Sequence, residues 1–449
     1  MKLLKLNISG VRGIVGQTIT PELIIDFASA FGLMLPPGMV LVGRDSRKSG
    51  LMIQEAVIAA LLSTGHEVIN LGICPTPIVQ YLVKVHRAVG AIAITAGHNP
   101  GDWNALNFLN KEGTYLNEFQ GLEFLDIYHL GKFSHQKLKR IPTVINELNP
   151  EEIYFSWLLN KIKKEEISRA KFKVVVDPCN GAGSRLVDKF FSWLGCELIA
   201  INNEPSGYFP HDPEPRPRNA GEVASLVRAT GGNIGFLLNS DASRVSLVTE
   251  NGETLSEEYT LPVVASHYLK QDPGPVVTSL STSRMIDEVA RKFQVPLIRT
   301  RVGQSALIQA MIQEQASMAG EGSGGVAFKN FQLAFDAFII MGLILEMMAL
   351  EQKKLSDLIR PLPRYHLVKD KIICPPHRLH SLVAECRKLY PRAEINSLDG
   401  LHLSLKDCWV HIRASNTEPL VRIIAESPSA VRAQLEVDKV VSFLNRLLG

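Results

Sequence analysis

The stretch that decides the fold is residues 39–71, MVLVGRDSRKSGLMIQEAVIAALLSTGHEVINL. Its first five residues, 39–43, are a short apolar run, which is typical of a buried strand. A helical pattern follows over residues 52–63, and residues 67–71 predict the next strand. A strand, a helix and a second strand in this order are typical of an α/β unit.

The same strand–helix alternation restarts twice further along the chain. The restarts are a strand and a helix at residues 171–177 and 186–194, and another pair at 275–278 and 284–293. Units of this kind direct the carboxyl ends of their strands toward a shared site. We therefore predict three similar α/β domains, with mixed sheets between helices, around a central cleft.

Beyond Arg364 the pattern changes to a smaller α+β unit. Helices are predicted at 379–389 and 430–448, and strands near 401–405 and 409–413. At 449 residues the chain is too long for one core, and polar stretches near 137–152, 250–258 and 355–364 are interpreted as linkers. The predicted domains are residues 1–148, 149–249, 250–363 and 364–449.

Composition and charge limit the class of protein. Apolar residues make up 46% of the chain, and 48 Lys plus Arg against 45 Asp plus Glu leave a net charge of +3. This balance gives no basis for a nucleic-acid or membrane partner. The six cysteines include no Cys-x-x-Cys pair, so buried free thiols in a reducing compartment are expected.

No targeting or membrane segment is predicted. Residues 1–7 break off before the apolar region of a signal peptide develops. The most apolar stretch, residues 337–350, is too short to span a bilayer and contains Glu346. It is interpreted as a buried helix of a cytoplasmic protein.

Residues 413–417, Arg-Ala-Ser-Asn-Thr, combine groups that suit a phosphate. The groups are a guanidinium fork, two hydroxyls and an amide, from Arg413, Ser415, Thr417 and Asn416. Together with the N–H groups of a turn they would hold a tetrahedral dianion, and Arg422 adds a second positive charge. The alternative is an ordinary turn with a solvated Arg413.

Residues 320–325, Gly-Glu-Gly-Ser-Gly-Gly, place four glycines around one carboxylate. Glycine lets a ligand approach the backbone closely. Glu321 would accept hydrogen bonds from two neighbouring sugar hydroxyls, with Ser323 beside it. The alternative is a flexible hinge.

A third loop, residues 95–100 (Thr-Ala-Gly-His-Asn-Pro), follows an apolar strand at residues 90–94. In this order and at these spacings, the loops resemble those of the α-D-phosphohexomutases, over essentially the whole chain. The matching segments are residues 9–16, 42–47, 74–77, 95–100, 104–108, 177–183, 239–244, 320–325 and 413–419, with Arg422 beyond them. The family moves phosphate between positions 1 and 6 of a sugar.

The resemblance implies an enzyme of carbohydrate metabolism, an isomerase acting by phosphotransfer, with a hexose phosphate as its small-molecule partner and Mg²⁺ as its cofactor. Arg12 would face the phosphoserine of the family. In this chain, however, that serine position is Gly97, which has no atom that can carry a phosphoryl group. The nucleophile is therefore absent.

Three further positions depart from the family, two of them in one loop. Its metal loop carries three aspartates, where this chain has Asn239, Asp241 and Ser243, so weak or no Mg²⁺ binding is predicted. Arg244 remains and would contact a phosphate. Asn107 stands where the family has a lysine beside the reacting hydroxyl, and asparagine is a poor substitute in proton transfer.

His98 is the one alternative nucleophile, because imidazole accepts a phosphoryl group. The preferred interpretation is that it is an oriented polar neighbour of the site, because the backbone step to residue 98 would direct its ring elsewhere. Under that interpretation His98 does not replace the missing serine.

Three functions stay open from the sequence. The first is a phosphosugar-binding pseudoenzyme with a degenerate active site, with a regulatory role or as the partner of an active paralogue. The second is an active phosphoglucose, phosphomannose or phosphoglucosamine mutase with an altered mechanism. The third is a structural subunit with a vestigial cleft. The sugar is not determined, since Gly325 replaces a histidine of some relatives.

Overall fold

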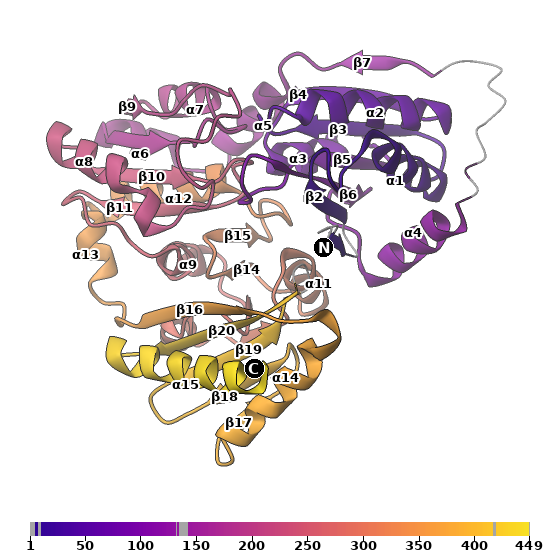
Figure 1. The fold of residues 1–449 in the computed structure, drawn as a ribbon. Helices are drawn as coiled ribbons and strands as arrows, with labels where there is room; N and C mark the ends of the chain where they lie inside the picture. Colours follow the sequence, from indigo (N-terminus) through magenta and orange to yellow (C-terminus); the bar gives the residue numbers. More distant parts are fainter. Residues whose placement is uncertain (1–4, 8–9, 132, 134–141, 416–418, 449) are drawn as a thin grey trace.

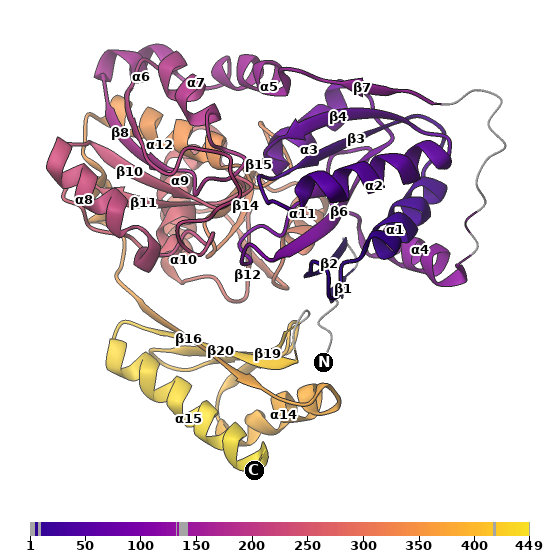
Figure 2. The same ribbon diagram turned by 45° about the horizontal axis from the view of Figure 1, so that its top comes forward.

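The computed structural model describes residues 5–7, 10–131, 133, 142–415 and 419–448. Its strands form four separate sheets, and the elements around each sheet are called the first, second, third and fourth unit. Figure 1 shows the fourth unit, with its orange and yellow elements, below the other three. After a 45° rotation, Figure 2 shows the same separation.

The first three units share one strand order. Across each sheet the order is fourth, third, first and second strand. In the first unit the strands are, in this order, β6 (Trp103–Asn110), β5 (Gly90–Ile94), β3 (Met39–Arg44) and β4 (Glu67–Ile73). In the second unit they are β11 (Val245–Thr249), β10 (Ile234–Leu238), β8 (Lys173–Asp177) and β9 (Glu197–Ala200). In the third unit they are β15 (Gly325–Phe328), β14 (Met318–Glu321), β12 (Val276–Ser279) and β13 (Leu297–Thr300). In each unit only the fourth strand is antiparallel to its neighbour in this set. The predicted three similar domains with mixed sheets are confirmed.

The first unit extends this pattern to seven strands. The additions are β2 (Gly10–Ile14), β1 (Lys5–Asn7) and β7 (Val144–Asn146), and the helices are α1 (Pro21–Met34), α2 (Gly50–Ser63), α3 (Thr76–Val85) and α4 (Glu118–Leu130). β5 is buried at all five positions, which explains its unbroken apolar sequence. Helix α4 begins at a capping box formed by Asn117 and Gln120.

Helices surround the second and third sheets. In the second unit they are α5 (Pro150–Leu159), α6 (Lys164–Ala170), α7 (Leu186–Trp193), the short 3₁₀ helix η1 (Pro217–Asn219) and α8 (Gly221–Thr230). In the third unit they are η2 (Glu257–Tyr259), α9 (Thr260–Gln271), α10 (Met285–Phe293), α11 (Gln304–Gln313), α12 (Ala337–Glu351) and α13 (Leu355–Ile359). One continuous apolar core joins these two units with one face of the first sheet.

The fourth unit is a five-stranded antiparallel sheet in the order β16–β20–β19–β18–β17. Its elements are β16 (His366–Ile373), η3 (Pro376–Arg378), α14 (Leu379–Glu385), η4 (Cys386–Leu389), β17 (Glu394–Asn396), β18 (Leu401–Ser404), β19 (Trp409–Ala414), β20 (Leu420–Ser427) and α15 (Ala430–Leu448). The predicted smaller α+β domain is confirmed. It has its own apolar core.

Helix α12 is the buried helix predicted from residues 337–350. Its single acidic side chain in that range, Glu346, is 1% exposed and accepts hydrogen bonds from His267 Nε2 at 2.9 Å and Lys163 N at 2.8 Å. These bonds satisfy a carboxylate that burial would otherwise destabilise. Among the described residues, no helix is both long and apolar enough to cross a membrane.

Three local expectations differ from the structure. β7 lies inside the stretch interpreted as the first linker and pairs with β4, while α13 lies inside the third. The helix expected over 379–389 is α-helical only to Glu385 and then tightens to the 3₁₀ helix η4. Short elements of this kind carry too little periodic pattern to be recognised locally. All six cysteines are free, as expected.

Candidate functional site

The loops that join the third strand to the fourth are equivalent in the three α/β units. They are residues 95–102 after β5, 239–244 after β10 and 322–324 after β14. These are three of the loops that the sequence singled out. They meet directly, because Ser240 Oγ donates to Gly97 O at 2.7 Å and Val245 N donates to Gly324 O at 3.1 Å. The shared strand order therefore assembles one site from three units.

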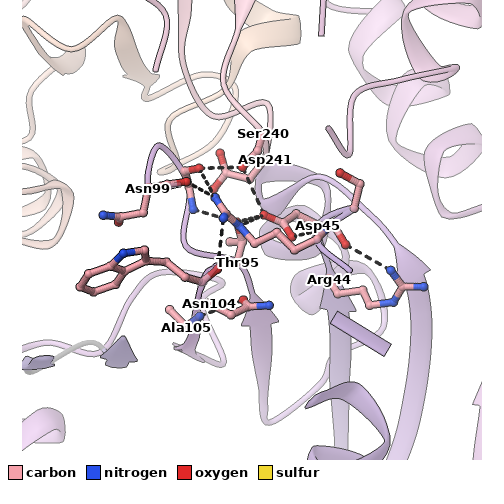
Figure 3. Close-up of polar contacts among 12 residues, drawn as sticks. Arg44, Asp45, Thr95, Asn99, Asn104, Ala105, Ser240 and Asp241 are labelled. Atoms are coloured by element: carbon pink, nitrogen blue, oxygen red, sulfur yellow. Dashed lines mark hydrogen bonds and ion pairs between the residues drawn. The ribbon is translucent and has the colours of Figure 1, made fainter. Parts of the chain in front are cut away.

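A fully buried arginine, Arg47, holds the loop at 95–100 in place. Figure 3 labels Thr95 and Asn99 of this loop and Asp45, which accepts a hydrogen bond from Thr95. Arg47 Nη2 donates to Gly97 O at 2.8 Å and Asn99 O at 2.7 Å. Its Nη1 donates to Pro100 O at 2.5 Å and Trp103 O at 3.1 Å. Its Nε pairs with Asp45 Oδ2 at 3.0 Å, so the charge is compensated. One side chain thereby fixes four backbone carbonyl groups in and beside the loop.

Gly97, where the family resemblance predicts the nucleophile position, has a left-handed backbone with φ of +56°. Its amide donates to Thr95 Oγ1 at 3.0 Å. A Cβ at this position would meet only Asp241 Oδ2, at 3.8 Å, so there is room for a larger residue. The conformation itself is one that residues with a Cβ rarely adopt.

The donor set of residues 239–243 does not fit a divalent cation. Asp241 supplies the one carboxylate, and its Oδ1 already accepts from Asn239 Nδ2 and Ser243 Oγ, both at 2.7 Å. The amide oxygen of Asn239 is occupied by Ser243 N and Arg244 N, each at 3.0 Å. Mg²⁺ requires free oxygen ligands, usually carboxylates. No cluster of three or more His, Cys, Asp or Glu suited to a metal occurs in the described part of the chain.

Asn107, where the family resemblance predicts a lysine, supports the backbone of the neighbouring strand. Its Nδ2 donates to Ala93 O at 3.1 Å and to Thr95 O at 2.8 Å. Both amide hydrogens are therefore bound to the backbone. The side chain braces the start of the loop at 95–100 and has no proton to transfer.

Positive side chains surround His98. Arg12 Nη1 donates to Asn99 Oδ1 at 2.8 Å, and Asn99 directly follows His98 in the chain. Burial lowers the pKa of His98 well below its ordinary value, and the charges of Arg244, Arg12, Arg422 and Arg216 lower it further. The imidazole is therefore neutral at physiological pH. The same surroundings favour a bound anion.

Arg244 links the loop at 239–244 to the glycine-rich loop of the third unit. Its Nε donates to Ser323 Oγ at 2.9 Å, and its Nη2 lies 3.4 Å from Glu321 Oε1. Ser323 Oγ in turn donates to Glu321 Oε1 at 2.9 Å. The carboxylate of Glu321 is 9% exposed, so it is fixed but still reaches the surface of the site.

The fourth unit contributes Arg413 and Arg422, which are paired across β19 and β20. Burial lowers the pKa of Arg413; among its charged neighbours, Asp399 and Glu321 raise the pKa and Arg422 lowers it. Asp399 lies 3.8 Å from Arg413 Nη1. Ser415 is buried, and its amide donates to Leu420 O at 2.9 Å. The other two predicted phosphate contacts, Asn416 and Thr417, lie outside the described residues.

The structure adds two residues that the sequence did not single out. Arg47 belongs to the matched segment 42–47, but its buried role depends on carbonyls some fifty residues away. Tyr115 lies beside the site, where burial raises its pKa and the charges of Asp241, Arg244 and Arg12 act on it. No local signal marks Tyr115, because it follows β6 and its antiparallel bridge to Leu109 has no sequence pattern of its own.

An imidazole also secures the segment that packs against Arg47 through Phe209. His211 Nε2 pairs with Asp177 Oδ2 at 3.1 Å, and its Nδ1 donates to Asp212 O at 2.8 Å. Burial is the largest single effect and lowers the pKa of His211, but the interactions with Asp177, Cys179 and Asp212 together outweigh it, and the pKa is raised to about 11. The ring is therefore an imidazolium that ties residues 202–220 to the end of β8.

Replacing His211 with Gln is expected to destabilise the protein most at low pH. Because its folded-state pKa is raised, the stabilisation is complete below the ordinary value of about 6.5 and is lost as the pH rises toward about 11. Urea unfolding of both proteins at mildly acidic, neutral and alkaline pH measures the difference. The exposed His380→Gln control should show no such trend, and a His211→Gln difference that stays constant with pH would contradict the assignment.

Comparisons with known proteins agree along the whole chain. Residues 4–129, 152–252 and 256–365 match the models of alpha/beta/alpha domains I, II and III of phosphoglucomutase/phosphomannomutase. Residues 383–442 match the C-terminal domain of the same family. The order of these matches is the order of the four units.

Individual relatives show similarity over nearly their full length. A phosphoglucomutase/phosphomannomutase of Thermococcus kodakarensis is 34% identical, covering 98% of both chains. A probable phosphoglucosamine mutase of Pyrococcus abyssi is 32% identical over 96% of this chain and 95% of its own. A crystal structure of a family protein from Burkholderia thailandensis is 25% identical with a TM-score of 0.84, covering 98% of this chain and 97% of that one.

Proposed function

Because the chain belongs to the phosphoglucomutase/phosphomannomutase family, the α-D-phosphohexomutases, we propose that it binds a hexose phosphate but is impaired in mutase chemistry. The single observation that carries the proposal is Gly97 at the centre of an otherwise assembled site. Its neighbours Arg12, His98, Arg244 and Glu321 come from three units and converge there.

The charge distribution supports phosphate binding. Arg12, Arg244 and Arg422 act on one neutral imidazole, and Arg413 is largely buried with its charge only partly compensated by Asp399 at 3.8 Å. Partly buried guanidinium groups form strong charge-assisted bonds to phosphate oxygens. Glu321 is positioned to accept hydrogen bonds from sugar hydroxyls. A solvated, vestigial cleft would not need this many fixed arginines.

The proposed impairment rests on the chemistry of Gly97, of Asn107 and of the loop at 239–243. Gly97 has no oxygen to accept a phosphoryl group, and both amide hydrogens of Asn107 are engaged by backbone carbonyls. Phosphoryl transfer depends on positioning a nucleophile and on neutralising the developing charge. The loop at 239–243 offers one carboxylate, whose oxygens accept protein donors, so the neutralising cation has no site of the family's kind.

An active mutase with an altered mechanism is the second candidate, because relatives that are 34% and 32% identical to this chain are named mutases. The neutral state of His98 favours this candidate, since only an unprotonated imidazole attacks phosphorus. Titration calorimetry with several hexose 1- and 6-phosphates tests the binding proposal itself. Absence of heat with every sugar phosphate would contradict it.

Replacing Arg413 with Ala is expected to weaken phosphosugar binding by about 1.5–3 kcal/mol, or roughly 10- to 150-fold in Kd. The reason is the loss of a charge-assisted bond to the phosphate from a partly desolvated guanidinium. Calorimetry with the tightest sugar phosphate measures the change. The exposed Arg392 on the same unit supplies a matched control, Arg392→Ala, and equal affinities in both variants would reject the role of Arg413.

A further inference from the structure

The carboxylate of Asp241 is enclosed by hydrogen-bond donors. Oδ1 accepts from Asn239 Nδ2 and Ser243 Oγ, each at 2.7 Å, and from Ser243 N at 3.2 Å. Oδ2 accepts from Thr76 Oγ1 at 3.1 Å. The residue is 5% exposed, so these four donors, and not water, balance its charge.

Two of these donors stand at positions where the family carries acceptors. Asn239 and Ser243 replace aspartates, and each now points a hydrogen at the remaining carboxylate. Three carboxylates in one buried loop repel each other and need a cation between them. One carboxylate with an amide and a hydroxyl beside it is satisfied without a cation.

The fourth donor comes from another unit. Thr76 is the first residue of α3 in the first unit, whereas Asp241 belongs to the second. Besides the hydroxyl bond, Thr76 N donates to Asp241 O at 3.2 Å. The carboxylate therefore lies at the N-terminus of a ten-residue helix, where the helix dipole favours a negative charge.

The polar contact between the first and second units continues at Ser240, the residue before Asp241. Ser240 Oγ lies 3.2 Å from Asp45 Oδ2 (Figure 3) and donates to Gly97 O at 2.7 Å. Ser46 Oγ donates to Asn180 O at 2.7 Å. The Ser240, Asp45 and Ser46 side chains are buried. At the loops of the site, the contact between the first and second units is thus a chain of direct polar bonds, beside the apolar core that the units share.

We propose that residues 239–243 form a cation-independent latch between the first and second units, with the Asn239 amide and the Ser243 and Thr76 hydroxyls replacing a divalent cation around Asp241. The latch holds the loop at 95–100 against the second unit in the absence of Mg²⁺. Asp241 is a positioning residue in this arrangement, and its effect is on the assembly of the site. The latch does not depend on the identity of the ligand.

A double-mutant cycle on thermal stability tests whether the Thr76 and Asp241 side chains stabilise the protein together. Thr76→Val and Asp241→Asn each remove one partner, and each is expected to lower Tm by several degrees. If the two side chains act together, the double variant should lose clearly less than the sum of the single losses. Thr260 supplies the control, because its hydroxyl bonds Val245 O at 2.8 Å, away from Asp241. Thr260→Val with Asp241→Asn should be additive, and additivity in the Thr76 cycle as well would overturn the proposal.

The second test is whether Tm depends on a divalent cation. The Tm of the wild-type protein should be the same in EDTA and in excess Mg²⁺, and calorimetric titration with Mg²⁺ alone should give no heat of binding. Asn239→Asp with Ser243→Asp turns two donors into charged acceptors, so its Tm in EDTA should fall and Mg²⁺ should restore part of the loss. A Mg²⁺-dependent Tm in the wild type overturns the latch.

If the variant with Asn239→Asp and Ser243→Asp does not fold, the Tm of Ser243→Asp alone can be compared in EDTA and in Mg²⁺. Its change of charge is smaller. Thr76→Ser keeps the donor and should retain the wild-type Tm more closely than Thr76→Val. All of these measurements are made without sugar phosphate. Failure of the latch is therefore distinguishable from failure of phosphosugar binding, which is measured by titration with the sugar.

Discussion

Purified wild-type protein is expected to interconvert hexose 1- and 6-phosphates at least about 10⁴-fold more slowly than a relative with serine at position 97, because removing a covalent nucleophile commonly costs this much. Glycine has no oxygen to carry the phosphoryl group between the two ends of the sugar. A coupled assay with hexose 1-phosphate, its bisphosphate activator and Mg²⁺ measures the turnover. Robust activity would overturn the proposal, and acid-labile phosphate on His98 would then be the first alternative to test.

Restoring the serine alone is expected to recover little. Gly97→Ser must adopt φ near +56°, and its Cβ would lie 3.8 Å from Asp241 Oδ2. A phosphoserine there would be repelled by this carboxylate, because the donors around Asp241 balance its own charge and supply no positive charge for a second anion. The informative variant restores Gly97→Ser, Asn239→Asp, Ser243→Asp and Asn107→Lys together. Gly97→Ala is the matched control, since it introduces the same backbone strain without a hydroxyl.

Replacing Arg47 with Met is expected to lower the free energy of unfolding by about 3–5 kcal/mol, the usual cost of removing one partner from a buried ion pair. Burial raises the pKa of Asp45, whose charge depends on Arg47, and the four carbonyls would also lose their donor. Urea unfolding measures the loss, and faster proteolysis near residues 97–100 should accompany it.

Arg44 provides the comparison for Arg47. It is only half-buried and donates to Gln54 Oε1 at 3.1 Å and Asp45 O at 3.3 Å, so Arg44→Met should cost about 1 kcal/mol. Equal effects of the two substitutions would show that burial of the Arg47 ion pair does not dominate. Such a result would also mean that Arg47 is not what fixes the shape of the loop at 95–100.

The secondary structure was largely predictable, because it depends on patterns within about fifteen residues. The strand at 90–94 and the helix at 430–448 agree with β5 and α15 to the residue. The short elements β7 and α13 were missed, because three or five residues give no period to detect. Tertiary pairing and packing stabilise them, and neither is a local property.

Residue identity is enough to predict which chemistry the protein lacks. The identities of four residues do not depend on the fold: Gly97, Asn107, Asn239 and Ser243. A glycine has no oxygen that can carry a phosphoryl group. The resemblance of ordered loops, each following a predicted strand, also determined the family and hence the four units. These conclusions depend on residue identity and order alone.

Only the tertiary structure decided what the substituted residues do instead. Thr76 and Asp241 are 165 positions apart, and Ser240 and Gly97 are 143 apart, yet both pairs are bonded. A sequence shows that Asn239 and Ser243 have lost their charges, but not that their hydrogens point at Asp241. That depends on three sheets of equal strand order bringing their loops together, because hydrogen bonds form over about 3 Å and local sequence patterns do not encode distances between units.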